Sequence, residues 1–494
     1  MGIVIKQSFR NTIIIYLSFL VGGINTIIFY PRFLESEYYG IVTFILSASN
    51  LIMPLTAFGI QYTVVKFFSV YQDKVQKDRF LTLALILPFF ISLPLGYFWD
   101  TFHHWIMSNV AEENQNVESY TFYIYSVAVS CAFFEIFYAW TKVHLQTVFG
   151  NVLKEFWNRA VVMLLLVAVF LNQITKPEFI QFLAIAYVLR TLVMMGYAFR
   201  IYLPKFSLKP PDNFIEIIRY SLYIILAGSA GAILLDIDKV MIPGREGFQT
   251  AAYYTVAVFI GTFIEAPSRA MNQILQPLTS KTLNENNEKE VGVLYKKSSI
   301  NLLVIGGLFF LLVNCGVHEL FKLMPEKGYS GGELVVLMIS LAKLYTMFLG
   351  NNGAIISNSK FYRITLPIGV GMAIMVYLLN RWLFGIYGTN GLALATLMTI
   401  FSFNTFKLFY VKAKFRILPF TDKTWLLMTI IALFFFGFYF WNFNFNLGNE
   451  TLNILSNLIV KCGIIFLAYV ILIIKMNVSD EISTIFKKFT GNNR

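Results

Sequence analysis

Long apolar runs recur along the chain, separated by short polar segments that hold most of the charged residues. Runs such as 81–99 and 298–317 contain no charge over the roughly 20 residues that a helix needs to cross about 30 Å of hydrocarbon. The pattern predicts an all-α integral membrane protein with about fourteen transmembrane helices. We place them at 11–31, 39–61, 80–99, 119–140, 155–172, 179–199, 217–235, 250–276, 298–317, 333–351, 364–380, 389–409, 425–441 and 452–474.

The composition supports lipid as the solvent. Of 494 residues, 57% are hydrophobic and 13% are charged, which leaves too little polar surface for a water-soluble protein. Cys131, Cys315 and Cys462 lie inside apolar runs without paired spacing, so neither a disulfide framework nor a metal or redox site is predicted. We expect no cofactor, no metal and no enzymatic activity.

The net charge of +12 reflects membrane topology rather than nucleic-acid binding. If the N-terminus is cytoplasmic, about 27 of the 39 Lys and Arg residues fall on the cytoplasmic side and about seven on the outer side, as the positive-inside rule requires. Both termini are therefore expected in the cytoplasm, and no nucleic-acid partner is expected.

An internal repeat links the two halves of the chain. Residues 38–45 (YYGIVTFI) recur loosely as residues 253–260 (YYTVAVFI), at an offset of about 215 residues and with about six predicted helices between the copies. Parallel repeats of this kind leave a cavity between two pseudo-symmetric bundles in transporters. We therefore expect an N-terminal lobe at 1–205, a C-terminal lobe at 206–416, and two additional helices with a cytoplasmic tail at 417–494, arranged around a central cavity.

Polar residues follow one face of several predicted helices, which is typical of a wall that faces water. Small polar residues also let membrane helices pack closely, so the pattern alone leaves both interpretations open. The residues expected to line the cavity are Asn50, Gln61, Tyr187, Tyr197, Thr262, Asn272, Gln276 and Ser340.

Charges deep in the predicted helices are the strongest functional signal, because burying one without compensation costs at least about 2.5–3.5 kcal/mol. Five cations face two acids, Glu135 and Glu265, and such a surplus suits a diphosphate. The alternative is an ion pair between a cation and Glu135 or Glu265. These acids and Asp236 are also candidates for coupling to an ion. The five cations are Arg159, Arg190, Arg269, Lys343 and Lys461.

Two segments carry a family resemblance: 30–34 (YPRFL) through Tyr39-Gly40, and 238–243 (DKVMIP) through 253–257 (YYTVA). With the repeated architecture, they resemble the polysaccharide transporters, including Wzx-type O-antigen flippases, of the multidrug/oligosaccharidyl-lipid/polysaccharide (MOP) flippase superfamily. The resemblance implies a protein of the bacterial inner membrane. Its substrate would be an undecaprenyl-diphosphate-linked oligosaccharide, such as the O-antigen unit of lipopolysaccharide, moved by alternating access.

The same resemblance implies roles for individual residues and partners. Arg190, Arg269 and Lys343 would hold the diphosphate or acidic sugars, and Arg32 would guard the outer mouth. The expected partners are the lipid-linked oligosaccharide and membrane lipid, with a polysaccharide polymerase and assembly proteins as further candidates.

Two alternative functions stay open at the level of sequence. A cation-coupled multidrug exporter of the same superfamily would need a cavity lined mainly by carboxylates, whereas cations predominate here. A membrane-embedded O-antigen polymerase or ligase would be expected to have a long outer loop. The longest outer loop here spans only about residues 100–118.

Overall fold

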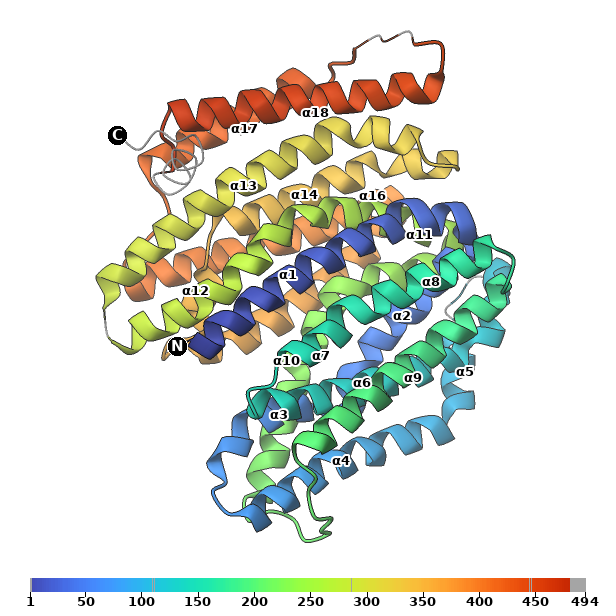
Figure 1. The fold of residues 1–494 in the computed structure, drawn as a ribbon, viewed down its shortest axis with the longest axis vertical. Coiled ribbons are helices and arrows are strands. Elements are labelled where there is room, and N and C mark those ends of the chain that lie inside the picture. The colour runs from blue at the N-terminus through green and yellow to red at the C-terminus, as the bar shows by residue number, and fades with distance from the viewer. Residues whose placement is uncertain are drawn as a thin grey trace. The chain divides into compact units, whose positions relative to one another are not determined.

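The computed structural model describes residues 2–479 except 109, 111, 286, 444 and 446, so the predicted cytoplasmic tail beyond 479 lies outside the described residues. Within these ranges the secondary structure is helical, with no strand. Among the residues that the structure describes, eleven helices are long and apolar enough to cross a membrane. Long helices run side by side within each compact unit of the chain (Figure 1). The predicted all-α membrane fold is therefore confirmed.

Several of the predicted spans lie in helices whose regular geometry is interrupted. The span 155–172 overlaps the π-helix η4 (Val152–Trp157) and α8 (Asn158–Phe170), and the short helix α7 (Val148–Asn151) precedes it. The span 250–276 is divided among α11 (Phe248–Thr262), the 3-10 turn η6 (Phe263–Glu265) and α12 (Ala266–Asn284). The spans 364–380 and 389–409 both lie in α16 (Thr365–Phe415). The count of about fourteen helices stays a prediction.

Within α16, the chain turns back on itself at Gly388. This residue has φ 57° and ψ −142°, outside helical geometry and in a region that glycine alone adopts readily. A Cβ atom on Gly391 would lie 2.1 Å from the carbonyl oxygen of Leu383. In a straight helix these two residues would be about 12 Å apart along the axis. The two glycines therefore let α16 form two antiparallel segments.

The first compact unit comprises residues 1–255 and 369–377. Helix α6 packs closely against α9 and α2, and α2 packs against α10. A buried cluster of this unit includes Phe80, Phe134 and Trp140. Pro31 lies inside the π-helix η1, where it cannot donate a backbone hydrogen bond. The main elements are α1 (Gly2–Ile24), η1 (Asn25–Leu34), α2 (Ser36–Thr56), α3 (Ile60–Phe67), α4 (Lys74–Tyr97), α5 (Trp99–Ser108), α6 (Thr121–Val143), α9 (Lys176–Ile201) and α10 (Phe214–Met241).

The second compact unit comprises residues 256–368 and 378–494. Helix α13 (Glu288–Lys322) is its centre, because α12, α14 (Glu333–Phe348), α17 (Asp422–Tyr439) and α18 (Glu450–Lys475) all pack against it. The short helix α15 (Asn352–Ser357) follows α14. The lobe boundary predicted at residues 205 and 206 follows the sequence repeat, whereas the compact units follow contacts, so that boundary stays a prediction.

Each unit carries an apolar groove, and the two grooves use matching positions of the repeat. The groove of the first unit has a volume of 390 Å³ and is lined by Val129, Ser130 and Phe133 of α6 and by Val188, Thr191 and Leu192 of α9. The groove of the second unit, of 790 Å³, is lined by Leu344, Tyr345 and Phe348 of α14 and by Met398, Phe401 and Ser402 of α16. The α6 and α14 residues differ by 215, and the α9 and α16 residues by 210. This match supports the internal repeat.

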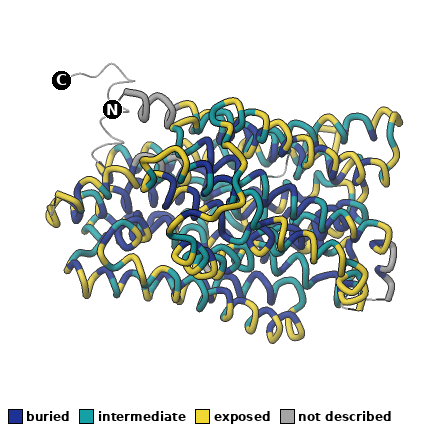
Figure 2. The backbone as a smooth tube through the Cα atoms, turned by 90° about the horizontal axis from the view of Figure 1, so that it is seen from below, coloured by how far each residue is buried: buried dark blue, intermediate teal, exposed yellow. Residues whose placement is uncertain are grey.

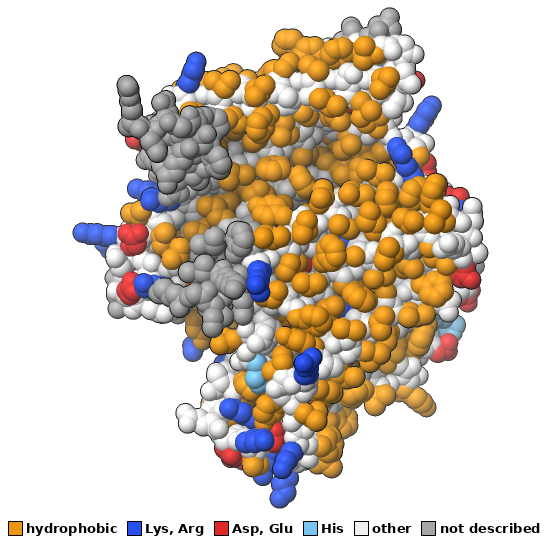
Figure 3. All heavy atoms as spheres, in the orientation of Figure 1, with side chains coloured by type: hydrophobic (Ala, Val, Ile, Leu, Met, Phe, Trp, Pro, Cys, Tyr) orange, Lys and Arg blue, Asp and Glu red, His pale blue; other side chains and the backbone are white. Residues whose placement is uncertain are grey.

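The surface agrees with a lipid environment. Exposed residues follow the outward turns of the helices (Figure 2). On the face shown in Figure 3, apolar side chains predominate along the helices, and charged side chains gather near helix ends. Helices satisfy their own backbone hydrogen bonds, so such a surface is stable in hydrocarbon.

Replacing Gly391 by Ala is expected to disrupt the turn in α16. The new methyl group would overlap the carbonyl of Leu383, and overpacking of this kind costs about 1–3 kcal/mol or more. Thermal unfolding of the purified protein in detergent measures the loss. The control is Gly437→Ala in α17, where a Cβ atom meets no neighbour within 4 Å, and its unfolding temperature should stay the same or rise slightly.

Candidate functional site

Arg190 of α9 lies in an aromatic environment inside the first unit. Its side chain is 4% exposed, and its guanidinium carbon lies 4.1 Å from the ring centre of Phe134 and 4.8 Å from that of Tyr187. One guanidinium nitrogen lies 3.4 Å from the sulfur of Cys131, and Nε has no hydrogen-bond partner. No carboxylate among the described residues lies within ion-pair distance. Arg190 is therefore a buried cation in contact with two aromatic rings and a sulfur atom.

Glu135 of α6 pairs with a different cation. Its carboxylate lies 2.6 Å from Nζ of Lys154 in η4, while Arg190 and Lys142 act on it from further away. Nζ of Lys142 lies 3.8 Å from the ring centre of Tyr138. Within the described ranges, no carboxylate is at ion-pair distance from Lys142. The alternative of a pair between Arg190 and Glu135 is thus not what the structure shows.

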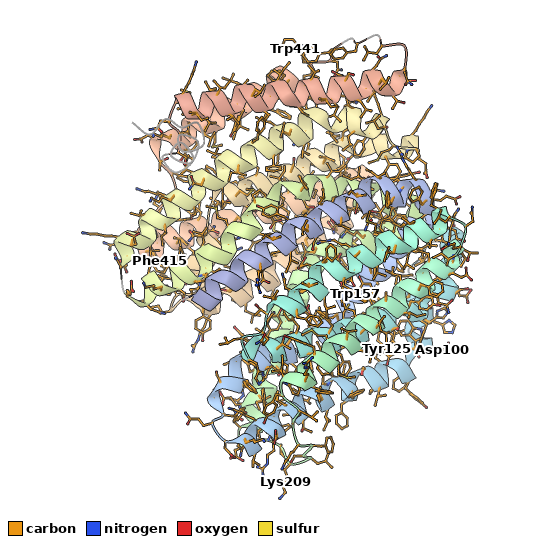
Figure 4. The ribbon with its side chains drawn as sticks, in the orientation of Figure 1. Asp100, Tyr125, Trp157, Lys209, Phe415 and Trp441 are labelled. Atoms are coloured by element: carbon orange, nitrogen blue, oxygen red, sulfur yellow. The ribbon has the colours of Figure 1, made fainter. Side chains whose placement is uncertain are left out.

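Arg159 connects η4, α8 and the first helix. Its Nη1 lies 3.5 Å from the carboxylate of Glu155, one turn away, and its guanidinium lies 5.3 Å from the ring centre of Phe19. Its backbone carbonyl accepts a 2.7 Å hydrogen bond from the amide of Asn25, where η1 begins. Nearby, Trp157 donates to the carbonyl of Ala186 in α9 at 3.3 Å (Figure 4). Segments distant in sequence are thereby held around this arginine.

Asp236 of α10 forms a polar cluster with α2. Its carboxylate accepts hydrogen bonds from Ser47 and from the predicted cavity residue Asn50, each at 3.2 Å. Nζ of Lys239 lies 3.0 Å from the same carboxylate. The carboxylate, hydroxyl and amide groups gathered here are oxygen-rich partners of the kind that hard cations bind. Asp236 also acts electrostatically on Tyr187, which connects this cluster with Arg190.

In the second unit, Glu265 and Lys343 form the internal ion pair that sequence reasoning kept as an alternative. Nζ of Lys343 in α14 lies 2.6 Å from the Glu265 carboxylate, and their side chains are 14% and 23% exposed. Arg269, one turn further along α12, is exposed and acts on Glu265 from a greater distance. Glu265, the acid of this pair, is the last residue of the 3-10 turn η6.

The other predicted polar residues of the second unit have mixed environments. Ser340 is fully buried and exchanges hydrogen bonds with Asn314 of α13, at 3.0 and 3.3 Å. Thr262 donates to a backbone carbonyl of its own helix, and Asn272 donates to Ser268. Gln276 is exposed. Hydrogen bonds between α13 and α14 account for Ser340, and a bond within its own helix accounts for Thr262, without any substrate.

Three further predicted residues belong to the first unit. Gln61 is 8% exposed, and its side-chain oxygen has no partner. The ring of Tyr197 is tilted by 40° against that of Phe149, with ring centres 4.3 Å apart, and its hydroxyl donates to the side-chain oxygen of Gln146. Arg32, at the end of η1, is exposed and has no carboxylate at ion-pair distance in the part of the chain that the structure describes.

The expected ratio of five cations to two acids is wrong, because two acids were missed. Glu155 pairs with Arg159, and Glu319 of α13 lies 3.5 Å from Lys461 of α18, with side chains 2% and 1% exposed. Asn457 donates to the same Glu319 carboxylate at 2.9 Å. Glu319 lies one turn before the end of α13, so its position in the sequence indicated an exposed helix end. Of the five cations, Arg190 keeps no acid partner.

Replacing Lys461 by Ala is expected to destabilise the second unit strongly. The change leaves the Glu319 carboxylate buried without its cation, a loss of about 3–5 kcal/mol. Thermal unfolding in detergent measures the effect. The double variant Glu319→Gln with Lys461→Met should recover most of it, because no unpaired charge remains. Lys281→Ala breaks the exposed pair with Glu285 and should cost under about 1 kcal/mol. Equal losses of stability in Lys461→Ala and Lys281→Ala would contradict this account.

Known proteins share this fold. The chain is 12% identical to the lipid II flippase MurJ in its inward closed conformation, with a TM-score of 0.72 over 95% of this chain and 99% of that one. For an inward-facing multidrug resistance MATE family transporter of the MOP superfamily, identity is 16% and the TM-score 0.59, over 83% and 98%. For a MOP superfamily transporter from Pyrococcus furiosus the values are 13% and 0.58, over 85% and 96%.

Sequence comparisons identify the family. The uncharacterized membrane protein MJ1375 of Methanocaldococcus jannaschii is 28% identical over 194 residues, which cover 39% of this chain and 45% of that protein. The chain therefore spans less than half of this relative. The family model described as polysaccharide biosynthesis protein matches residues 6–283, more than half of the chain. This chain therefore belongs to the polysaccharide biosynthesis protein family and has the fold of MOP superfamily transporters.

Proposed function

We propose that this protein is a flippase that moves a lipid-diphosphate-linked oligosaccharide, such as an O-antigen unit, across the bacterial cytoplasmic membrane by alternating access. The family match and the transporter fold support a role in moving polysaccharide precursors. Undecaprenyl diphosphate is the lipid carrier that we infer for it. The protein performs no covalent chemistry in this proposal, and a polymerase and assembly proteins act on the product.

The observation that carries the proposal is the buried position of Arg190 without a carboxylate. A cation in a medium of low polarity loses its hydration, and two aromatic rings replace only part of that energy. Such a group is costly unless an anion reaches it during the transport cycle. An arginine is well suited to this role, because its planar guanidinium can form two parallel hydrogen bonds to phosphate oxygens.

The surroundings of Arg190 favour an anion over a cation. The neighbouring Glu135 is already neutralised by Lys154. Lys142, whose ammonium lies over the ring of Tyr138, and Arg190 both act on the same carboxylate from further away. Three cations therefore act on this one carboxylate of the first unit. This distribution disfavours a multidrug exporter for cationic compounds, which would need unpaired carboxylates.

The apolar groove of the second unit suits the lipid part of such a substrate. Its 790 Å³ are lined by Leu, Met and Phe side chains from α13, α14, α16 and α17. In the proposed cycle the lipid tail stays in the bilayer while the polar part enters the protein. An apolar groove open to lipid would hold the start of a prenyl chain without burying any polar group.

Other predicted residues keep secondary roles in this proposal. Lys343 and Arg269 flank Glu265 and would contact acidic sugars, and Arg32 would contact substrate at the outer end of η1. Asp236, Glu265 and Glu135 each lie beside a lysine. Binding of a proton or a sodium ion at one of these carboxylates would break its ion pair and couple the cycle to an ion gradient.

Replacing Arg190 by Met is expected to stop transport while keeping or raising stability. Methionine fills the aromatic environment without a buried charge, whereas the phosphate loses a bidentate partner that contributes about 1.5–3 kcal/mol. We expect transport of a lipid-linked oligosaccharide in proteoliposomes to fall about 10- to 100-fold. Arg190→Lys should retain an intermediate rate, since it keeps the charge but loses the planar geometry.

The matched control is Arg200→Ala, which removes an exposed arginine from the same helix and should transport normally. Thermal unfolding of each variant separates a transport defect from a folding defect. Normal transport by Arg190→Met would refute the proposed diphosphate site. A large loss of stability in that variant would instead assign Arg190 a structural role.

A further inference from the structure

A polar pocket of 300 Å³ lies where several helices of the second unit end. It is formed by the end of α12, the start of α13, the turn after α15 and the end of α16, on the side predicted to be cytoplasmic. Its volume is at the lower end of the range of about 300–1,000 Å³ typical of ligand sites. The lining residues are Leu283, Asn284, Asn287, Glu288, Asn358, Ser359, Lys360 and Phe415, the last of which is labelled in Figure 4.

The floor of this pocket is apolar and fixed in place. Phe415 is 9% exposed and belongs to a buried cluster with Val291, Tyr295 and Ile355. The ring of Phe361 stands perpendicular to that of Phe415, with their centres 5.7 Å apart. The polar side chains of the pocket therefore adjoin a packed, buried apolar cluster, which suits binding of a ligand.

Charges of both signs line or flank the pocket, and they are not paired with each other. Lys360 lines it, and its ammonium lies 5.3 Å from the ring centre of Phe361. The ammonium of Lys414 lies at the same distance from that ring. Two positive charges therefore share one aromatic ring. Glu288 lines the pocket as well, and across the described residues neither lysine nor Glu288 has an ion-pair partner.

We propose that this pocket binds a phosphoethanolamine group, the zwitterionic headgroup of phosphatidylethanolamine. The phosphate would lie beside Lys360 and Lys414, and the ammonium beside Glu288. Amides of Asn284, Asn287 and Asn358 and the hydroxyl of Ser359 can hydrogen-bond to either part. Helix ends that carry lysines lie at the level of lipid headgroups, so the ligand is available there. This proposal is independent of the flippase function.

Charge-removing variants test it through lipid selectivity. The purified full-length protein is equilibrated with mixed micelles of phosphatidylethanolamine and phosphatidylglycerol, washed, and analysed for retained lipid by native mass spectrometry. The wild type should retain phosphatidylethanolamine preferentially. Glu288→Gln should reduce that preference about two- to fivefold without weakening phosphatidylglycerol retention, because only the ammonium loses its partner. Lys360→Gln should lower retention of both lipids by a similar factor.

Two controls remove charges that do not line the pocket, Lys289→Gln and Glu285→Gln, and both should behave as the wild type. An excess of soluble phosphoethanolamine tests whether the pocket recognises the headgroup alone or the whole lipid. Displacement of the lipid would show that the headgroup alone is recognised, and persistent selectivity would show that the whole lipid is. Equal retention of both lipids by the wild type, or an unchanged preference in Glu288→Gln, would overturn the proposal.

Discussion

The absence of water in the bilayer core is the constraint on which the rest of this structure depends. Every charge carried into the helices must find compensation there, because hydrocarbon offers none. Glu135 with Lys154, Glu265 with Lys343, and Glu319 with Lys461 each solve this problem with an ion pair between helices. These pairs also fix which helix faces meet, since a shifted register would separate the charges.

Against this background, the environment of Arg190 differs in kind. Phe134 and Tyr187 stabilise its guanidinium through their ring faces, and Nε is left without a partner. As proposed above, a guanidinium held in this way binds an anion during transport. The fully buried Glu319 and Lys461 differ from Arg190, because their opposite charges neutralise each other and link α18 to α13.

The repeat explains how one architecture gives the two units different surfaces. Equivalent positions of α6 with α9 and of α14 with α16 form an apolar groove in each unit. Only the second groove is extended by α17, through residues such as Met428 and Phe435. Helix α17 therefore enlarges a surface that the repeat had already provided.

The sequence by itself determined the membrane class, the helical fold and the repeat, because these depend on hydropathy and spacing along the chain. It also placed Arg190 and Lys343 deep in their helices. Tertiary structure alone decided their partners: Lys343 meets Glu265, whereas Arg190 meets aromatic rings and Glu135 meets Lys154. Which side chains touch depends on helix rotation and on irregular segments such as η4 and η6. Partners more than about 15 residues apart leave no local periodicity from which to predict them.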